Sequence, residues 1–407
     1  MTEAQSRFAA QPWARNQYVM TATVFVVFTG FAFVIPFLPL FVRELGVSDP
    51  ERAALWAGVL IGISPLLAGL LAPLWGRLAD RHGQKRTALQ ALLAYVILLA
   101  LSAAVQDVWQ LLACRVGLGL FGAIGPLGLA MATSRAPREQ TGRAVGMIQA
   151  AQILSAAFGP FAGGFLADRL GMRRTFLVTA ALCLLALALV ARYYEERRAA
   201  ARAGHGPPPR AHLGSLLRLR GVPTLLVVLF FVNFVGRSFT PILPLHLERL
   251  GVGSGRVASA TGGLISSYAV AAALSAGLFG RASRRFSPRR LLTASLFGGA
   301  VVVGPMTTVA SFRGFLVLAV LLGLASGGAL TLCYTIGGLM VPAEVKTTAF
   351  GLLAGAALFG GALSPSVAGL LAGFSLLGIY WLDAAIFLGL ALVVLPSAWR
   401  PGGDAAT

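Results

Sequence analysis

The chain has 407 residues, of which 57% are apolar without counting its 49 glycines, and only 12% are charged. A soluble domain is about 45–50% apolar with glycine included and about 25% charged, so this composition excludes one large soluble core and favours a polytopic membrane protein. The net charge of +19 would suggest nucleic-acid binding in a soluble protein. Here the cations lie in short connections between apolar runs, which is typical of membrane topology, and we expect no nucleic-acid partner.

Apolar runs follow one another along the whole chain, and each is about long enough to cross a bilayer as a helix. We predict twelve spanning helices, at residues 18–42, 55–75, 87–105, 109–131, 143–166, 174–193, 222–247, 257–279, 291–310, 314–339, 347–371 and 376–397. The first run is too long for a signal peptide and no small-residue cleavage site follows it, so we expect no cleaved leader.

Lysine and arginine are distributed unevenly over the connections between these runs. With the N-terminus inside, the inside segments hold 23 of the 33 cations and the outside loops hold 8. Cytoplasmic loops carry an excess of Lys and Arg. We therefore expect a multi-pass protein of the inner (plasma) membrane with both termini in the cytoplasm.

The two halves of the chain repeat one another. Residues 36–40, Pro-Phe-Leu-Pro-Leu, recur 205 residues later as Pro-Ile-Leu-Pro-Leu at 241–245. We predict one six-helix bundle at residues 1–193 and another at 221–407, related by a pseudo-two-fold axis. The polar, arginine-rich segment 194–220 is predicted to be a cytoplasmic linker.

The connection between the second and third runs, residues 76–86, carries four cations, one carboxylate and two glycines. We expect a sharp turn at Gly83, with Asp80 beside Arg81 as a possible ion-pair latch. A degenerate copy lies at 280–290. Residues 164–174 are a further copy, 88 positions after the first. Three predicted helices separate these two, so the later copy should face the opposite side of the membrane, as in inverted three-helix repeats.

Residues 76–86 resemble the cytoplasmic signature loop of major facilitator superfamily transporters, Gly-x-Leu-Ala-Asp-Arg-x-Gly-Arg-Lys-x, with Gln84 in place of a cation. The resemblance implies that Asp80 latches one conformational state by binding the start of the eleventh span, near Lys346 to Ala349. Other partners implied for it are Arg81, Arg135 and Arg143. The residues of the implied latch are Gly76, Asp80, Arg81, Gly83, Lys85 and Arg86.

The fifth predicted span contains a run of small residues, Gly159-Pro160-Phe161-Ala162-Gly163-Gly164. Pro160 can kink a helix. The pairs Gly159/Gly163 and Pro160/Gly164 are each four apart, so we expect them to share one face where a neighbouring helix approaches closely. Ordinary small-residue packing is the alternative. The run resembles the antiporter motif of the drug:proton antiporter branch of the family, which implies a role in the rocking motion.

Few polar residues lie inside the predicted spans. Arg115 resembles the arginine of the branch's Arg-x-x-Gln-Gly motif, although Leu118 replaces the glutamine; it lines a cavity or snorkels to the interface. Arg237 either pairs with Asp383 or a helix C-terminus, or makes an electropositive cavity that prefers anionic or neutral amphiphiles. The candidates for contact with substrate or coupling ion are Arg115, Gln149, Gln152, Asn233, Arg237, Tyr268, Tyr334 and Asp383, and the proton carrier is to be sought among Asp80, Asp383, Glu44, Glu248 and His246.

The resemblance covers essentially the whole chain. It implies an all-α membrane protein with twelve transmembrane helices in two pseudo-symmetric six-helix bundles. The implied function is proton-coupled efflux of small amphiphilic molecules by a monomer, with the bilayer, protons and a small-molecule substrate as partners. A facilitator or importer of a small metabolite or organic anion remains the alternative, as does a receptor or scramblase.

A membrane enzyme would need a catalytic cluster, and the sequence has no His-rich, Asp-rich or Gly-x-Ser-x-Gly motif. The histidines have no metal-ligand spacing. Cys114, Cys183 and Cys333 fall inside apolar runs and are expected to be inert thiols. We therefore expect no enzyme activity, catalytic residue, cofactor or metal.

Overall fold

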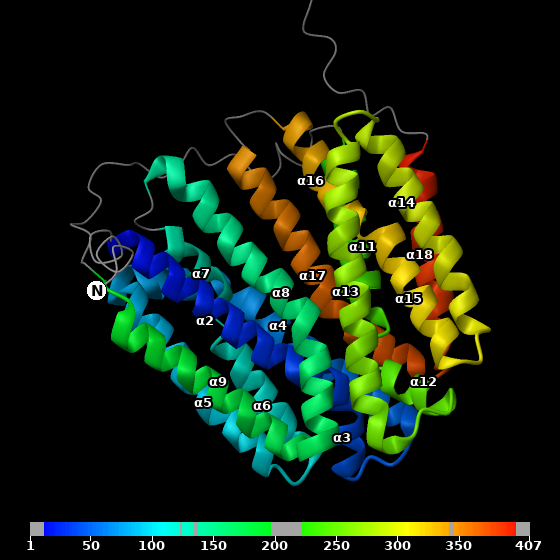
Figure 1. Ribbon diagram of the computed structural model, residues 1–407, viewed down its shortest axis with the longest axis horizontal. Coiled ribbons are helices and arrows are strands. Elements are labelled where there is room, and N and C mark those ends of the chain that lie inside the picture. The colour runs from blue at the N-terminus through cyan, green and yellow to red at the C-terminus, as the bar shows by residue number, and fades with distance from the viewer. Residues whose placement is uncertain (1–11, 123, 134–136, 197–220, 342–345, 396–407) are drawn as a thin grey trace, which may run out of the picture. The chain divides into compact units, whose positions relative to one another are not determined.

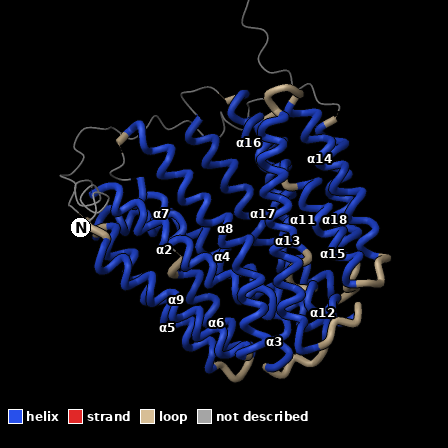
Figure 2. Tube along the Cα trace, in the orientation of Figure 1, coloured by secondary structure: helices blue, strands red, loops and turns tan. Residues whose placement is uncertain are grey.

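The computed structural model describes residues 12–122, 124–133, 137–196, 221–341 and 346–395. These ranges contain helices and short connections and no strand, as Figure 2 shows. A helix satisfies every backbone hydrogen bond within its own segment, which makes it the natural form for an apolar run in lipid.

The first half of the chain begins with a helix that is broken near its end. The helices in this half are α2 (Pro12–Val34), η1 (Ile35–Phe37), α3 (Leu38–Glu44), α4 (Pro50–His82), α5 (Gln84–Ala104), α6 (Val108–Leu120), α7 (Ile124–Thr133), α8 (Arg138–Leu170) and α9 (Met172–Tyr193). Pro36 lies in η1 and Pro39 at the start of α3. Proline has no N–H to donate to the helical hydrogen bonds. The helix therefore breaks at Pro36 and Pro39, the two prolines that recur in the second half.

The second half has the same order of long and broken helices. Its helices are α11 (Val222–Ser238), α12 (Leu243–Arg249), η2 (Ser254–Arg256), α13 (Val257–Ala282), α14 (Pro288–Val303), η3 (Gly304–Thr307), α15 (Phe312–Ser326), α16 (Gly328–Met340), α17 (Lys346–Ala372) and α18 (Gly378–Val394). Helices α11 and α12 bend by 44° at the second pair of prolines.

The described helices agree with the predicted membrane spans. Nine are long and apolar enough to cross a bilayer, the bent pair α11–α12 can form one more span, and α6 and α18 are shorter apolar helices. In chain order these segments overlap all twelve predicted spans, so the all-α membrane architecture is confirmed.

The chain divides into two compact units, and each borrows one segment from the other half of the sequence. Unit 1 contains Met1–Asp49, Ile63–Arg202 and Val252–Ser266, and unit 2 contains Pro50–Gly62, Ala203–Gly251 and Ser267–Thr407. Helices α4 and α13 therefore each contribute to both units. The predicted linker 194–220 lies mostly outside the described residues, and the boundaries at 193 and 221 stay a prediction.

Equivalent helices pack together in the two units. In unit 1, α2 lies along α8 and α9, and α5 along α9, as Figure 1 shows. In unit 2, α11 lies along α17, and α14 along α18. The pairs α2–α8 and α5–α9 thus correspond to α11–α17 and α14–α18, in the order that the repeat predicts.

Close glycine contacts repeat in the same way. In unit 2, a Cβ on Gly58 would lie 2.1 Å from the Pro365 carbonyl oxygen. In unit 1, a Cβ on Gly262 would lie 2.0 Å from the Pro160 carbonyl oxygen. The two glycines are 204 residues apart and the two prolines 205, so the sequence repeat preserves one tight helix contact in each unit.

Candidate functional site

The predicted loop at residues 76–86 is a one-residue break between two helices. Helix α4 continues to His82, and α5 begins at Gln84. Gly83 lies between them with φ of +95°, a conformation that only glycine adopts without strain. The prediction of a sharp turn at Gly83 is confirmed, and helix extends through the rest of residues 76–86, where Leu78 and Ala79 are good helix formers.

The copy at residues 164–174 has the same local structure. Helix α8 ends at Leu170, and Gly171 has φ of +90°. The Gly171 N–H donates to Ala167 O at 2.9 Å, and Thr175 Oγ1 donates to Gly171 O at 3.0 Å. At the first copy, Thr87 Oγ1 donates to Gly83 O at 2.9 Å. The two motifs therefore have the same glycine turn and the same threonine hydrogen bond.

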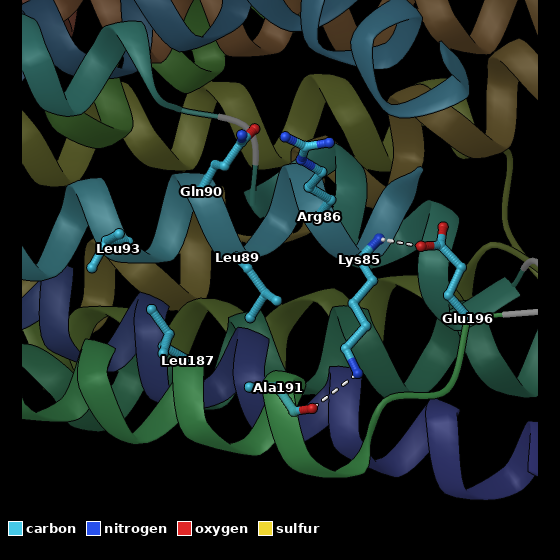
Figure 3. A pocket seen from close by; sticks show the side chains of 8 residues that line it. All are labelled: Lys85, Arg86, Leu89, Gln90, Leu93, Leu187, Ala191 and Glu196. Atoms are coloured by element: carbon cyan, nitrogen blue, oxygen red, sulfur yellow. Dashed lines mark hydrogen bonds between the residues drawn. The ribbon is translucent and has the colours of Figure 1, made fainter. Parts of the chain in front are cut away.

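Glu196 and Lys85 tie the first copy to the end of α9. The Glu196 carboxylate accepts from the N–H groups of Gln84 at 2.5 Å and Lys85 at 3.3 Å. Lys85 Nζ donates to the carbonyl of Ala191 at 2.9 Å (Figure 3). It also donates to the carbonyl of Tyr194 at 2.7 Å. A carboxylate at a helix N-terminus and a cation at a helix C-terminus both complement the helix dipole.

Lys85 was predicted only as part of the latch. In the structure it binds the carbonyls at the end of α9, within its own unit. Glu196 was not among the residues predicted to be functional. Its signal was an acidic pair, Glu195-Glu196, directly after the sixth span.

Two more cations repeat the contact that Lys85 makes. Arg173 Nη1 donates to Ala103 O at 2.9 Å and to Val105 O at 2.7 Å, at the end of α5. Arg289 Nε donates to Val394 O at 3.0 Å, at the end of α18. These arginines lie 88 and 204 residues after Lys85. The first cation of α5, α9 and α14 thus closes the C-terminus of a neighbouring helix in its own unit.

A groove runs beside each of two of these contacts. The groove between α5 and α9 has a volume of about 510 Å³ (Figure 3) and is lined by Lys85, Arg86, Leu89, Gln90, Leu93, Leu187, Ala191 and Glu196. A second groove of about 810 Å³, between α14 and α18, is lined in part by Arg289, Arg290, Thr293, Phe297 and Leu392. The first groove lies on the surface of unit 1 and the second on the surface of unit 2.

Asp80 and Asp168 hold the same position in the two copies but differ in their contacts. Asp80 is exposed and has no hydrogen bond or ion pair among the described residues. Of its predicted partners, Arg135 and the side chain of Lys346 lie outside the described part of the chain. Asp168 Oδ2 accepts from the Ser259 N–H at 2.8 Å, in the first turn of α13 within unit 1.

The small residues of α8 face two helices, so the expectation of one shared face was wrong. A Cβ on Gly163 would lie 2.1 Å from Phe33 Cα, and one on Gly159 would lie 2.5 Å from Ala32 Cβ, both on α2. A Cβ on Gly164 would lie 2.1 Å from the Ala258 carbonyl oxygen, on α13. Adjacent residues on a helix point about 100° apart, so each pair has its own neighbour.

Among the residues expected in a cavity, the charged ones differ in burial. Arg115 is only 6% exposed, and its Nε and Nη2 have no partner among the described residues. Arg237 is exposed, and it makes no ion pair with Asp383 within the described chain. Of the alternatives considered for Arg237, the ion pair with Asp383 is therefore absent from the described residues. Asp383 is 1% exposed and instead accepts a short hydrogen bond from Ser238 Oγ, a residue that the sequence argument missed.

The uncharged candidates are more accessible. Gln149 is exposed and Gln152 half-buried on α8. Asn233 Nδ2 donates to Leu229 O at 3.0 Å, within its own helix. Tyr334 stacks on Phe350, with ring centroids 5.9 Å apart. Tyr268 lies edge-on to Phe239 and interacts with the charges of Asp383 and Arg237. Unit 2 thus brings Arg237, Tyr268 and Asp383 together.

No cluster of three or more potential metal ligands occurs in the part of the chain that the structure describes. Cys114, Cys183 and Cys333 are buried and unpaired. The polar side chains therefore form a set of charges and hydrogen-bonding groups inside apolar helices.

Comparison with known proteins gives the same assignment. The family model of the Major Facilitator Superfamily matches residues 20–265 and 255–406. The chain is 33% identical over 324 residues to Multidrug resistance protein MdtG of Dickeya zeae (strain Ech586), covering 80% of this chain and 79% of that one. It is 31% identical to the protein of that name from Proteus mirabilis (strain HI4320), covering 80% and 81%.

Solved structures share the fold at lower identity. A bacterial homolog of the human lysosomal transporter Spinster has a TM-score of 0.74 at 18% identity, covering 94% of this chain and 95% of that one. A D-xylose–proton symporter has a TM-score of 0.72 at 15% identity, covering 95% and 99%. The chain belongs to the Major Facilitator Superfamily, and it is a multi-pass secondary transporter of the membrane.

Proposed function

We propose that the chain exports small amphiphilic molecules in exchange for protons, by alternating access in the inner (plasma) membrane. The observation that carries the proposal is the identity of 31–33%, over 80% of the chain, to proteins named Multidrug resistance protein MdtG. The resemblance of Gly159, Pro160, Gly163 and Gly164 to the antiporter motif supports the exchange of substrate for protons.

Expression in a host that lacks its own drug exporters tests this function. Cells that make the protein should accumulate less of a set of fluorescent amphiphiles than cells with an empty vector, and a protonophore should abolish the difference. Equal accumulation in both cells for every compound, at verified expression, would contradict export.

Both termini lie in the cytoplasm in this proposal. The support is the 23-to-8 division of cations between inside segments and outside loops, which follows the positive-inside rule. Single cysteines placed at residues 203–212 should react with a membrane-impermeant reagent only from the cytoplasmic side. Reaction from the outside alone would reverse the topology.

The motif of Gly76, Asp80, Arg81, Gly83, Lys85 and Arg86 acts as a conformational latch. Asp80 binds the start of α17 in one state of the cycle, and its exposed, unpartnered carboxylate is available for this among the described residues. The support is the contact of Asp168, which binds the first turn of α13 from the same position of the copy. Such a contact contributes about 0.3–1 kcal/mol, enough to bias a two-state equilibrium severalfold.

The substrate path is lined by the polar residues inside the spans: Arg115, Gln149, Gln152, Asn233, Arg237, Tyr268, Tyr334 and Asp383. An exposed Arg237 without a carboxylate partner within the described chain supports a preference for anionic or neutral amphiphiles. A lipophilic cation would lack a paired carboxylate there to offset its desolvation. One chain supplies all twelve spans, so the transporter works as a monomer.

A further inference from the structure

Unit 2 contains a carboxyl group that is buried in the middle of a helix. Asp383 is 1% exposed on α18. Its Oδ2 accepts a hydrogen bond from Ser238 Oγ on α11, whereas its Oδ1 has no partner among the described residues. Of the fourteen carboxylates in the sequence, it is the one that lies well inside a predicted span.

A second buried polar group lies one helical turn away. Tyr380 precedes Asp383 by three residues and interacts with it electrostatically, and its ring centroid is 5.7 Å from that of His246 on α12. Tyr380 is 1% exposed and His246 5%. Phe315 packs on both rings, 4.9 Å from His246 and 6.0 Å from Tyr380.

Asp383, Tyr380 and His246 carry half of the buried, unpartnered polar side-chain atoms of the described chain. Eight buried side-chain atoms there lack a hydrogen-bond partner, and four of them are Asp383 Oδ1, Tyr380 Oη and the two ring nitrogens of His246. Buried polar groups are nearly always hydrogen-bonded, to protein or to ordered water. Four such atoms on neighbouring side chains are therefore suited to bind water and to pass a proton between them.

The elements packed around Asp383 carry few other charged or titratable groups. Tyr268 on α13 interacts with the charges of both Asp383 and Arg237 and with the side chain of Ser326. Helix α14 packs along α18 but carries charge only at Arg289 and Arg290. Arg289 binds the carbonyl of Val394, about 16 Å along the helix from Asp383.

The remaining neighbours bring no ion pair to the carboxyl either. The charged residue of α17 is Lys346, at its first position. Arg249 at the end of α12 acts on His246, and both Arg249 and Arg313 of α15 are exposed. A buried carboxylate without an ion pair is costly, so its charge is best tolerated while water reaches it.

We propose that Asp383 is the proton-binding site of the transporter, with Ser238 as its hydrogen-bonding partner and with His246 and Tyr380 as its proton path to solvent at the end of α12. This assignment rests on the proposed exchange of substrate for protons. One proton enters from solution, is held on Oδ1 and leaves to solution, so the carboxyl group ends each cycle as it began. Arg237 and Tyr268 connect this site to the exposed part of the helices.

A labelling experiment on the wild-type protein tests proton binding directly. Dicyclohexylcarbodiimide adds to protonated carboxyl groups in apolar surroundings, and peptide mass spectrometry locates the adduct. We expect Asp383 to be modified, and modification to fall as the pH is raised. Absence of modification at Asp383 from acidic to alkaline pH, with another carboxyl group labelled, would overturn the assignment.

A transport experiment tests coupling. In proteoliposomes with an imposed pH gradient, Asp383→Asn should lower the ratio of gradient-driven accumulation to substrate exchange by at least about tenfold. The matched control is Asp107→Asn, because Asp107 caps α6 by accepting from the Gln110 N–H and asparagine caps equally well. Wild-type accumulation by Asp383→Asn would refute the site.

A matched pair of variants tests the proton path. Tyr380→Phe removes an unpartnered buried hydroxyl, and we expect a fall in driven accumulation relative to exchange. Tyr95→Phe removes a hydroxyl from a buried tyrosine of unit 1 and should leave the ratio unchanged. An equal effect of both variants would contradict a path through Tyr380.

The outcomes separate this inference from the proposed function. A wild-type protein that shows no accumulation in response to the pH gradient would contradict proton coupling itself. Coupled wild-type transport together with a fully coupled Asp383→Asn would contradict only the location of the proton.

Discussion

The two arginines inside the spans are placed in different surroundings. Arg115 is 6% exposed, whereas Arg237 is exposed and packs its Cδ and Nε 3.2 Å from the position of a Cβ on Gly361. Arginine keeps its charge at any working pH, and a charge inside a membrane is costly unless it meets water or a partner. Of the two side chains, the exposed one of Arg237 is therefore the one whose charge we expect a substrate to meet.

Arg237→Ala should weaken export of anionic amphiphiles by about tenfold, equivalent to ~1.4 kcal/mol of lost interaction, and should change export of neutral ones much less. Initial rates for a matched pair of dyes that differ by one carboxylate measure this. Arg237→Lys keeps the charge and is the control. A uniform loss for both dyes would assign Arg237 to structure.

Gly163 on α8 lies directly against the backbone of α2. Gly163→Leu should disrupt this contact and block transport, because its Cβ alone would lie 2.1 Å from Phe33 Cα. Overpacking of this kind typically costs about 1–3 kcal/mol, which a fall in thermal unfolding temperature would record. Gly146→Leu is the matched control, since Gly146 is on the same helix with open space around it. Unchanged flux with altered substrate preference in Gly163→Leu would place this face in the substrate path.

At the scale of helices, the cation two residues after Gly83 and the one two residues after Gly171 each hold a neighbouring helix end. Lys85→Met removes two charge-assisted hydrogen bonds to the end of α9. Hydrogen bonds to charged groups contribute about 1.5–3 kcal/mol, so the unfolding temperature should fall. Arg86→Met should leave it nearly unchanged, because Arg86 has no hydrogen bond or ion pair among the described residues. An equal fall in unfolding temperature in the two variants would contradict the role of Lys85 as a cap of α9.

The two aspartates of the repeated motif allow a paired prediction. Asp80→Asn should abolish transport with little change in thermal stability, since Asp80 has no partner within the described ranges. Asp168→Asn should lower stability by about 0.3–1 kcal/mol, because its charge lies at the first turn of α13. Thermal unfolding and flux measured on both variants check this, and wild-type flux from Asp80→Asn would refute the latch.

Spans, repeats and the turn at Gly83 could be predicted from the sequence, because apolar length and recurring motifs are local properties. The caps of Lys85 and Arg173 could not, since they depend on which helix ends lie within reach of a long side chain. The same is true of Ser238, which is an unremarkable residue until α18 brings Asp383 against it. The two faces of the α8 motif followed from helix geometry and could have been foreseen.

At the scale of the molecule, each unit is made of one half of the chain with a segment exchanged. Pro50–Gly62 packs in unit 2 and Val252–Ser266 in unit 1. These segments lie in α4 and α13, the second helix of each half, and both use a glycine to contact a proline-bearing helix. The repeat therefore preserves contacts as well as sequence, although Gly373 stands at the position equivalent to Asp168.

The central claim is that the chain exchanges substrate for protons, and one flux measurement tests it most directly. Purified protein is reconstituted into liposomes whose lumen is more acidic than the bath, with a fluorescent amphiphile outside. We expect accumulation above the equilibrium level, which collapses when a protonophore is added and which protein-free liposomes do not show. Uptake that reaches the same level with and without the pH gradient would contradict it.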